Sequence, residues 1–234
     1  MMLTRSFHTK SKESYFPIQR IPETEDEGEF NYTHTYDQMM RRIRDMGLLQ
    51  IQLILEKSIT QGLALEIGPG PGYIGLEWLK HTSNTMLKGL DISPEMIKIA
   101  ERNATEYSLS DRVEYRKGSG SEIPFDDSYF DALFTYHSLH EWSKPEETFN
   151  EIERVLRVGG KYMIFDLRRD IFPIIKSLML FNTLPEEIRP KLIASINASY
   201  VEVEVQAILK QTRLCDSIIE KNSTGMVISG SKHR

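Results

Sequence analysis

The sequence reads Glu66-Ile67-Gly68-Pro69-Gly70-Pro71-Gly72 between a strand-like run, 63–67, and a helix-like run that begins at Tyr73. Glycine lets the backbone turn sharply and approach a ligand closely, because it has no Cβ. The N-terminus of the following helix favours a negatively charged group. A tight strand-to-helix turn is the plainer explanation, but three alternate glycines exceed what such a turn requires. The loop therefore predicts a nucleotide-like ligand.

The spacing of the glycines separates two classes of ligand. A dinucleotide fingerprint has the form G-x-G-x-x-G, and Tyr73 stands where its third glycine belongs. Asp91 ends the second strand-like run, 19 residues after Gly72, where an acid can accept hydrogen bonds from a ribose diol. The pattern indicates a nucleoside-containing ligand other than a nicotinamide dinucleotide.

Strand-like and helix-like segments alternate after Gly62, which predicts a parallel α/β sheet with right-handed crossovers. The predicted strands are 63–67, 86–92, 112–117, 130–136 and 161–167. Ser93-Pro94-Glu95 has the residues of a helix start, and Pro145 opens another helix that we expect to end at Gly159-Gly160. The tail has a helix-like stretch, 199–211, and two strand-like runs, 214–221 and 225–231. The three residues between these two runs permit only an antiparallel hairpin.

The N-terminal part differs in composition from this core. Residues 1–30 mix basic, hydroxyl and acidic side chains that bury little apolar surface, so we expect a flexible start. Residues 36–59 carry apolar side chains at helical spacing with an interruption near Gly47, which predicts two helices in tandem. We expect a flexible N-terminus and helical lid in 1–60, one main domain in 61–234, and a lid insertion at about 170–195.

Composition narrows the class of partner. The net charge of -5 and the pI near 5.8 provide no cationic field for a polyanion, so a small molecule is expected and no nucleic acid. The single cysteine, Cys215, excludes an intramolecular disulfide and suits a cytoplasmic location. The most apolar window, 171–184, falls short of the roughly 20 residues of a membrane span.

The motifs resemble those of the class I, Rossmann-like S-adenosylmethionine-dependent methyltransferases, in particular the group that includes the ubiquinone/menaquinone-biosynthesis C-methyltransferases. The resemblance covers 63–232, and its four motifs are 66–72, 90–96, 123–131 and 153–161. It implies a three-layer α/β/α fold with a seven-stranded, mostly parallel sheet of order 3-2-1-4-5-7-6. Strand 7 would be antiparallel, in agreement with the terminal hairpin. The implied cofactor is S-adenosyl-L-methionine, with S-adenosyl-L-homocysteine as product.

The resemblance also implies roles for individual residues near the cofactor. Glu66 would organise the loop and the ammonium contacts, Asp91 would hold the ribose, and Ser119-Gly120 stands where the family commonly has Asp-Ala. Tyr36 lies where related enzymes fold a helix over the cofactor. The implied cofactor-binding set is Tyr36, Glu66, Gly68, Pro69, Gly70, Gly72, Asp91, Ile92, Met96, Ser119, Gly120, Tyr136 and His137.

The segment 136–142 follows the fourth strand, at the carboxyl end of the sheet where ligands of such folds bind. If the acceptor must lose a proton, His140 is the first candidate for the base, followed by Asp166 and Tyr136. A structural hydrogen-bonding role for His140, and an ion pair of Asp166 with its neighbouring arginines, are the alternatives. No pattern typical of a metal site is present, so no metal is expected.

These observations predict methyl transfer to a small-molecule acceptor by in-line displacement. The segment 170–195 is rich in Ile, Leu, Met and Phe and would cap a hydrophobic acceptor, form a homodimer contact or pack as core. A cationic patch at Arg41, Arg42 and Arg44 would meet an anionic substrate or form a solvated helix face. The rival functions are a regulatory or assembly protein that binds S-adenosylmethionine without methylating, and a nicotinamide-dependent oxidoreductase.

Overall fold

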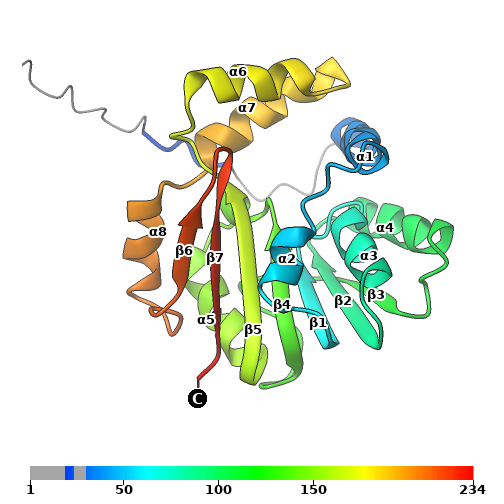
Figure 1. The fold of residues 1–234 in the computed structure, drawn as a ribbon, viewed down its shortest axis with the longest axis vertical. Helices are drawn as coiled ribbons and strands as arrows, with labels where there is room; N and C mark the ends of the chain where they lie inside the picture. The colour runs from blue at the N-terminus through cyan, green and yellow to red at the C-terminus, as the bar shows by residue number, and fades with distance from the viewer. Residues whose placement is uncertain (1–18, 24–29, 234) are drawn as a thin grey trace, which may run out of the picture.

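The computed structural model describes residues 19–23 and 30–233, and a seven-stranded sheet forms its centre (Figure 1). The strand order is β3-β2-β1-β4-β5-β7-β6. The strands are β1 (Gly62–Ile67), β2 (Thr85–Asp91), β3 (Val113–Lys117), β4 (Phe130–Tyr136), β5 (Leu156–Leu167), β6 (Ile218–Lys221) and β7 (Gly225–Ser231). All neighbouring strands are parallel except β7, which is antiparallel to β5 and to β6. The predicted sheet order and the antiparallel strand 7 are confirmed.

Two hydrophobic clusters cover the two faces of the sheet, because successive side chains of a strand point to opposite faces. In β7, Met226 and Ile228 belong to one cluster and Val227 belongs to the other. The first cluster includes side chains of α5 (Pro145–Val155) and α8 (Glu202–Leu209). The second includes side chains of α2 (Gln52–Glu56), α3 (Tyr73–Lys80) and α4 (Pro94–Glu106). The result is the expected three-layer α/β/α arrangement.

Two predicted helix ends are wrong. The helix that starts at Pro145 ends at Val155 rather than at Gly159-Gly160, since Leu156 is extended and pairs with Phe130 at the start of β5. The two glycines lie in a strand whose register shifts opposite Phe130 and Ala132, and Gly159 has a φ of +79°. They mark an irregular strand instead of a helix cap. Residues 199–201 likewise separate two helices, so α8 begins only at Glu202.

Helical segments lie above the carboxyl ends of the parallel strands (Figure 1). They are α1 (Phe30–Asp45), α6 (Pro173–Asn182), the 3₁₀ turn η2 (Glu186–Ile188) and α7 (Arg189–Ala198). α1 starts before the predicted 36 and precedes α2, as the tandem pattern predicted. The N-terminal residues expected to be flexible, mainly 1–18 and 24–29, lie outside the described residues. The boundary at residue 60 between the lid and the main domain stays a prediction.

Within 19–23 and 30–233, no single helix is long and apolar enough to cross a membrane. One bent pair, Glu186–Ala198 with Glu202–Leu209, meets the length and composition requirements together, at an angle of 58°.

Candidate active site

A cavity of about 520 Å³ opens at the carboxyl ends of β1, β2 and β4. Its floor is formed by the loops that follow these strands, and α1, η2 and α7 contribute side chains from above. Tyr36 comes from α1, whereas Lys191 and Ser195 come from α7. A partly enclosed cavity of this volume is typical of a small-molecule site.

The glycine-rich loop forms one wall of the cavity. Gly68 and Gly70 line it with φ values of +65° and +52°, a region that favours glycine. Gly72 (φ +82°) and Pro69 do not line it. A Cβ at Gly72 would lie 2.6 Å from the hydroxyl oxygen of Tyr115. The first two glycines therefore face the ligand space, and the third permits close packing of α3 against the sheet.

Asp91 ties the end of β2 to the glycine-rich loop. Its Oδ2 accepts a hydrogen bond from the backbone N–H of Gly70 (2.9 Å), and its Oδ1 accepts one from that of Ser93 (2.9 Å). Burial raises the pKa of Asp91 to about 6, and Glu141 adds to the shift while the two N–H groups oppose it. The carboxyl group is therefore mostly ionised at neutral pH. It lines the cavity, and an ionised carboxylate can accept hydrogen bonds from hydroxyl groups.

A second wall carries the residues expected to receive an adenine. Ile92 and Met96 line the cavity with their apolar side chains, and Ser119 and Gly120 lie beside them. The Ser119 hydroxyl lies 2.9 Å from the Oγ of Ser121 and accepts a hydrogen bond from its backbone N–H. It is thus largely committed to a local turn. A Cβ at Gly120 would lie 3.0 Å from the Thr148 methyl group, so glycine lets this wall pack tightly against the core.

Glu66 is placed differently from the expectation, since it does not line the cavity. The side chain is buried and accepts a hydrogen bond from the backbone N–H of Gly75 in α3, while Oε2 has no hydrogen-bond partner. A Cβ at Gly75 would lie 2.2 Å from this oxygen, so only glycine leaves room for the carboxyl group. Burial, followed by the charge of Asp91, raises the pKa of Glu66 to about 8.

Tyr136 and His137 form the wall at the end of β4. Their rings lie 4.2 Å apart, and the Tyr136 ring lies 4.9 Å from that of Phe165. Burial raises the pKa of both Tyr136 and Tyr36 well above the ordinary tyrosine value, so each phenol keeps its proton. Burial also lowers the pKa of His137 to about 4, which keeps this imidazole neutral. Both tyrosines therefore carry a phenol O–H that can donate a hydrogen bond.

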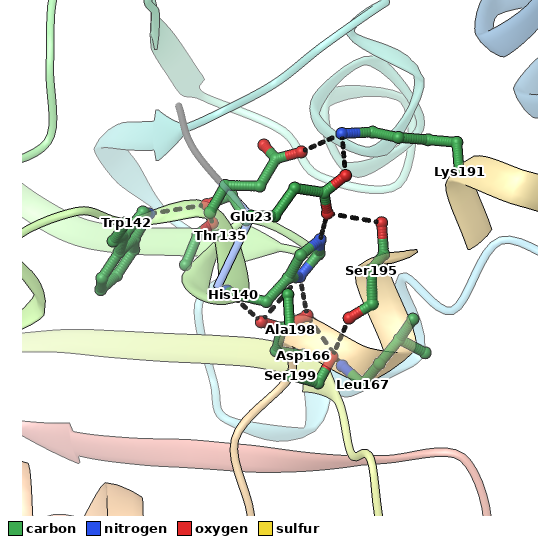
Figure 2. Close-up of polar contacts among 12 residues, drawn as sticks. Glu23, Thr135, His140, Trp142, Asp166, Leu167, Lys191, Ser195, Ala198 and Ser199 are labelled. Carbon is green, nitrogen blue, oxygen red and sulfur yellow. Dashed lines mark hydrogen bonds and ion pairs between the residues drawn. The ribbon is translucent and has the colours of Figure 1, made fainter. Parts of the chain in front are cut away.

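His140 and Asp166 form a buried pair (Figure 2). The backbone N–H of His140 donates to Asp166 Oδ2 (2.6 Å), and Nδ1 lies 2.8 Å from Oδ1. The backbone N–H of Leu167 also donates to Oδ1 (2.8 Å). Burial alone would lower the pKa of His140, but the charge and hydrogen bond of Asp166 outweigh it and raise the pKa. The adjacent arginines bind other acids, with Arg168 on Asp170 and Arg169 on Glu204.

Three further polar residues meet at this pair, and the sequence reasoning missed them. Glu23 Oε1 lies 2.5 Å from Lys191 Nζ, and the Ser195 hydroxyl donates to Oε2 (3.1 Å). The same Oε2 lies 3.8 Å from His140 Nε2. More than 160 residues separate Glu23 from its partners on α7, so no local spacing could have indicated this contact.

Among the described residues, Glu23, His140 and Glu141 have donor atoms within 4.8 Å of one another, an arrangement that could hold a metal ion. The ammonium group of Lys191 contacts both carboxylates, at 2.5 Å and 3.1 Å. A cation is thus already present between the two acids. The expectation of a metal-free site stays a prediction.

The cavity fits S-adenosylmethionine in several respects. Asp91 at the end of β2 can accept hydrogen bonds from hydroxyl groups, apolar side chains line the neighbouring wall, and glycines allow close approach. Two buried polar atoms of cavity-lining residues, Thr33 Oγ1 and His137 Nε2, have no hydrogen-bond partner within the described chain. The lining also carries three carboxylates, Glu23, Asp91 and Glu141, against the single ammonium of Lys191. This excess of negative charge suits a ligand with a sulfonium cation.

Comparison with known proteins also indicates a methyltransferase. Residues 65–164 match a family model described as a methyltransferase domain. The chain is 24% identical over 189 residues to the ubiquinone/menaquinone biosynthesis C-methyltransferase UbiE of Roseobacter denitrificans, covering 75% of this chain and 74% of that one.

Solved structures share the fold. A Methanococcus maripaludis protein that its description classes with the S-adenosyl-L-methionine-dependent methyltransferases is 25% identical, with a TM-score of 0.70 over 91% of this chain and 98% of that one. Geranyl diphosphate C-methyltransferase of Streptomyces coelicolor, solved with Mg²⁺, geranyl diphosphate and S-adenosyl-L-homocysteine, is 13% identical. Its TM-score is 0.61 over 92% of this chain and 91% of that one.

The sheet order, the glycine-rich loop beside Asp91 and the methyltransferase-domain match agree with one another. The chain therefore has the Rossmann-like fold of the class I methyltransferases and is an S-adenosylmethionine-dependent methyltransferase, with S-adenosyl-L-methionine as its cofactor.

Proposed function

We propose that this methyltransferase methylates a small-molecule acceptor that binds between His140 and α7. The observation that carries the proposal is the His140–Asp166 pair, which lies beside the Tyr136–His137 wall of the same cavity. Cofactor and acceptor would then meet in one enclosed space. Such alignment of two reactants accounts for much of the acceleration that enzymes achieve.

The cofactor-binding roles follow from the walls of the cavity. Asp91 would hold the ribose hydroxyls, Gly68 and Gly70 would allow close approach of the methionine part, and Ile92 and Met96 would flank the adenine. When bound, S-adenosylmethionine supplies a methyl carbon that its positively charged sulfur has already activated. Pro69, Gly72 and Glu66 would act indirectly, by shaping the loop and its packing against α3.

His140 is proposed as the general base for acceptors that lose a proton. With Nδ1–H donated to Asp166, the neutral imidazole presents Nε2 as a proton acceptor on the cavity side. The acceptor atom gains the methyl group, its proton passes to Nε2, and the sulfur keeps the electron pair of the broken C–S bond. Asp166 stabilises the resulting imidazolium and is a positioning residue. Tyr136 keeps its proton and would orient a ligand.

Apolar side chains of the lid insertion divide into two sets. Ile188 and Leu192 line the cavity, which supports an acceptor with an apolar body. Ile174, Leu178 and Phe181 of α6 are exposed by 56–77%, on the outer helix of the lid (Figure 1). These exposed side chains are consistent with the predicted homodimer contact. The molecular mass in solution would test that prediction.

The test is incubation of the purified chain with methyl-labelled S-adenosylmethionine and a metabolite extract, followed by separation by size. We expect label in a compound small enough to enter the cavity. Label confined to protein or nucleic acid would overturn the small-molecule assignment. Tight binding of the cofactor with no labelled product would instead favour the regulatory or assembly protein.

A further inference from the structure

A short N-terminal segment, residues 19–23, crosses the acceptor side of the cavity. Arg20 anchors it by donating to the backbone oxygens of Ala198 (2.5 Å) and His140 (2.9 Å). The Arg20 guanidinium also lies 3.9 Å from the centre of the Tyr200 ring. The backbone N–H of Ile21 donates to Asn197 O (3.1 Å), so the segment contacts both the last turn of α7 and the turn that carries His140. We call residues 19–23 the strap.

The strap brings the carboxylate of Glu23 into a set of donors that belong to other parts of the fold (Figure 2). Lys191 supplies an ammonium group at 2.5 Å and Ser195 a hydroxyl group at 3.1 Å. Both residues are on α7, four positions apart, so they lie on one face of that helix. An ammonium and a hydroxyl that converge on two oxygens form a recognition pattern for a carboxylate.

Lys191 has an acidic partner besides the Glu23 of the strap. Glu141 of the 3₁₀ turn η1 (Leu139–Glu141) lies 3.1 Å from Lys191 Nζ and would continue to hold the ammonium if Glu23 left. Without Glu23, the ammonium group of Lys191 has one acidic partner, Glu141, instead of two. Removal of Glu23 therefore leaves room for one further carboxylate beside the ammonium group of Lys191. A cation would have to displace this ammonium group to bind at the same place.

The place of the Glu23 carboxylate relates it to the proposed chemistry. Its Oε2 lies 3.8 Å from His140 Nε2, longer than a hydrogen bond, and the same cavity contains Tyr136 and His137. A molecule whose carboxylate replaced that of Glu23 would present its neighbouring atoms to Nε2. Ile188 and Leu192 would contact its apolar part.

We propose that Lys191 and Ser195 form the carboxylate subsite of the acceptor, and that Glu23 is an internal occupant which a small carboxylic acid with an apolar body must displace. The acceptor class is then a carboxylic acid, and the strap competes with it. This inference rests on the proposed function, because it places the acceptor in the same cavity beside His140.

The test is calorimetric binding of two probes of similar size and opposite charge, benzoate and benzylamine. Glu23→Ala removes the internal carboxylate, and Glu56→Ala removes an exposed glutamate on α2 as the matched control. We expect Glu23→Ala to bind benzoate about tenfold more tightly than wild type, because Glu23 of the wild-type protein occupies the subsite most of the time. Glu56→Ala should match wild type, and benzylamine should show no gain.

The double variant Glu23→Ala/Lys191→Met should lose the gain in benzoate affinity. Arg20→Ala loosens the strap and leaves Lys191 and Ser195 unchanged, so it should show part of the gain in benzoate affinity. If Glu23→Ala does not fold, this second variant tests the carboxylate subsite. Unchanged benzoate affinity, a gain that survives removal of Lys191, or a gain for benzylamine instead would each overturn the inference.

The binding test needs no methyl transfer, so it separates this inference from the proposed function. A gain in benzoate binding without any labelled product would leave the subsite standing and remove the proposed function. Labelled product from an acceptor without a carboxylate, with no gain in benzoate binding, would do the reverse.

Discussion

The Nδ1 atom of His140 lies 2.8 Å from Oδ1 of Asp166, although the two residues come from separate elements, η1 and β5, 26 positions apart. β4 and β5 are neighbouring parallel strands, so the turn after β4 and the end of β5 meet at the same edge of the sheet. The pair is thus a direct consequence of sheet order.

Asp166 should control the acidic limb of the pH–rate profile. The carboxylate stabilises the charged imidazole and raises the pKa of His140, whose neutral form is the base, so activity should rise with pH through that raised value. Asp166→Asn removes the charge and should move the acidic limb to lower pH while lowering the maximal rate. Profiles of kcat/KM for both proteins measure the shift. Limbs that coincide would mean that another group controls the profile.

Asp91 and Ser119 should differ sharply in their effect on cofactor binding. Asp91→Ala removes an ionised acceptor and two loop hydrogen bonds, so we expect the Kd for S-adenosyl-L-homocysteine to rise at least about tenfold. Ser119→Ala should change it less than about threefold, because that hydroxyl is bound to Ser121. Calorimetry on both variants tests the contrast. Equal losses would show that Ser119 also binds the adenine.

Glu66 should make the chain less stable as pH rises. Its pKa is about 8 in the folded protein against an ordinary value of 4.5, so between these values the folded state binds more protons than the unfolded state. The free energy of unfolding therefore falls with pH across this window. Glu66→Gln lacks this titration, and its stability relative to wild type should increase from pH 5 to pH 8. Urea unfolding at several pH values measures it, and parallel curves would contradict the buried, protonated carboxyl group.

Removal of metal ions should leave methyl transfer unchanged. The ammonium of Lys191 already contacts the carboxylates of Glu23 and Glu141, the two acids that with His140 could ligate a cation. Activity measured before and after treatment with EDTA checks this expectation. A loss of activity that Mg²⁺ restores would contradict a metal-free reaction.

Much of the fold followed from local patterns in the sequence. Glycine spacing, strand-like runs and the short terminal join depend on neighbours along the chain, and the resemblance supplied the sheet order. The incorrect helix end at Gly159-Gly160 has the same origin. Glycine permits both a helix cap and an irregular strand, and only the pairing of Leu156 with Phe130 decides between them.

The candidate site was less accessible to such reasoning. His140, Asp166 and Tyr136 could be named because they lie at or just after the carboxyl ends of neighbouring strands. The contact of Glu23 with Lys191 and Ser195 depends on how the strap crosses α7, which no periodicity encodes. The orientation of Glu66 toward Gly75 depends on helix packing rather than on the motif that contains it.

The measurement that tests the His140–Asp166 centre most directly is single-turnover methyl transfer to the acceptor identified from the extract. Wild type, His140→Ala and His81→Ala would be compared at saturating cofactor, with the exposed His81 at the end of α3 as the control. We expect His140→Ala to be slower by about 10² to 10⁴, with an unchanged Kd for S-adenosyl-L-homocysteine, and His81→Ala to match wild type. Equal rates for His140→Ala and wild type would contradict the assignment of His140 as the base.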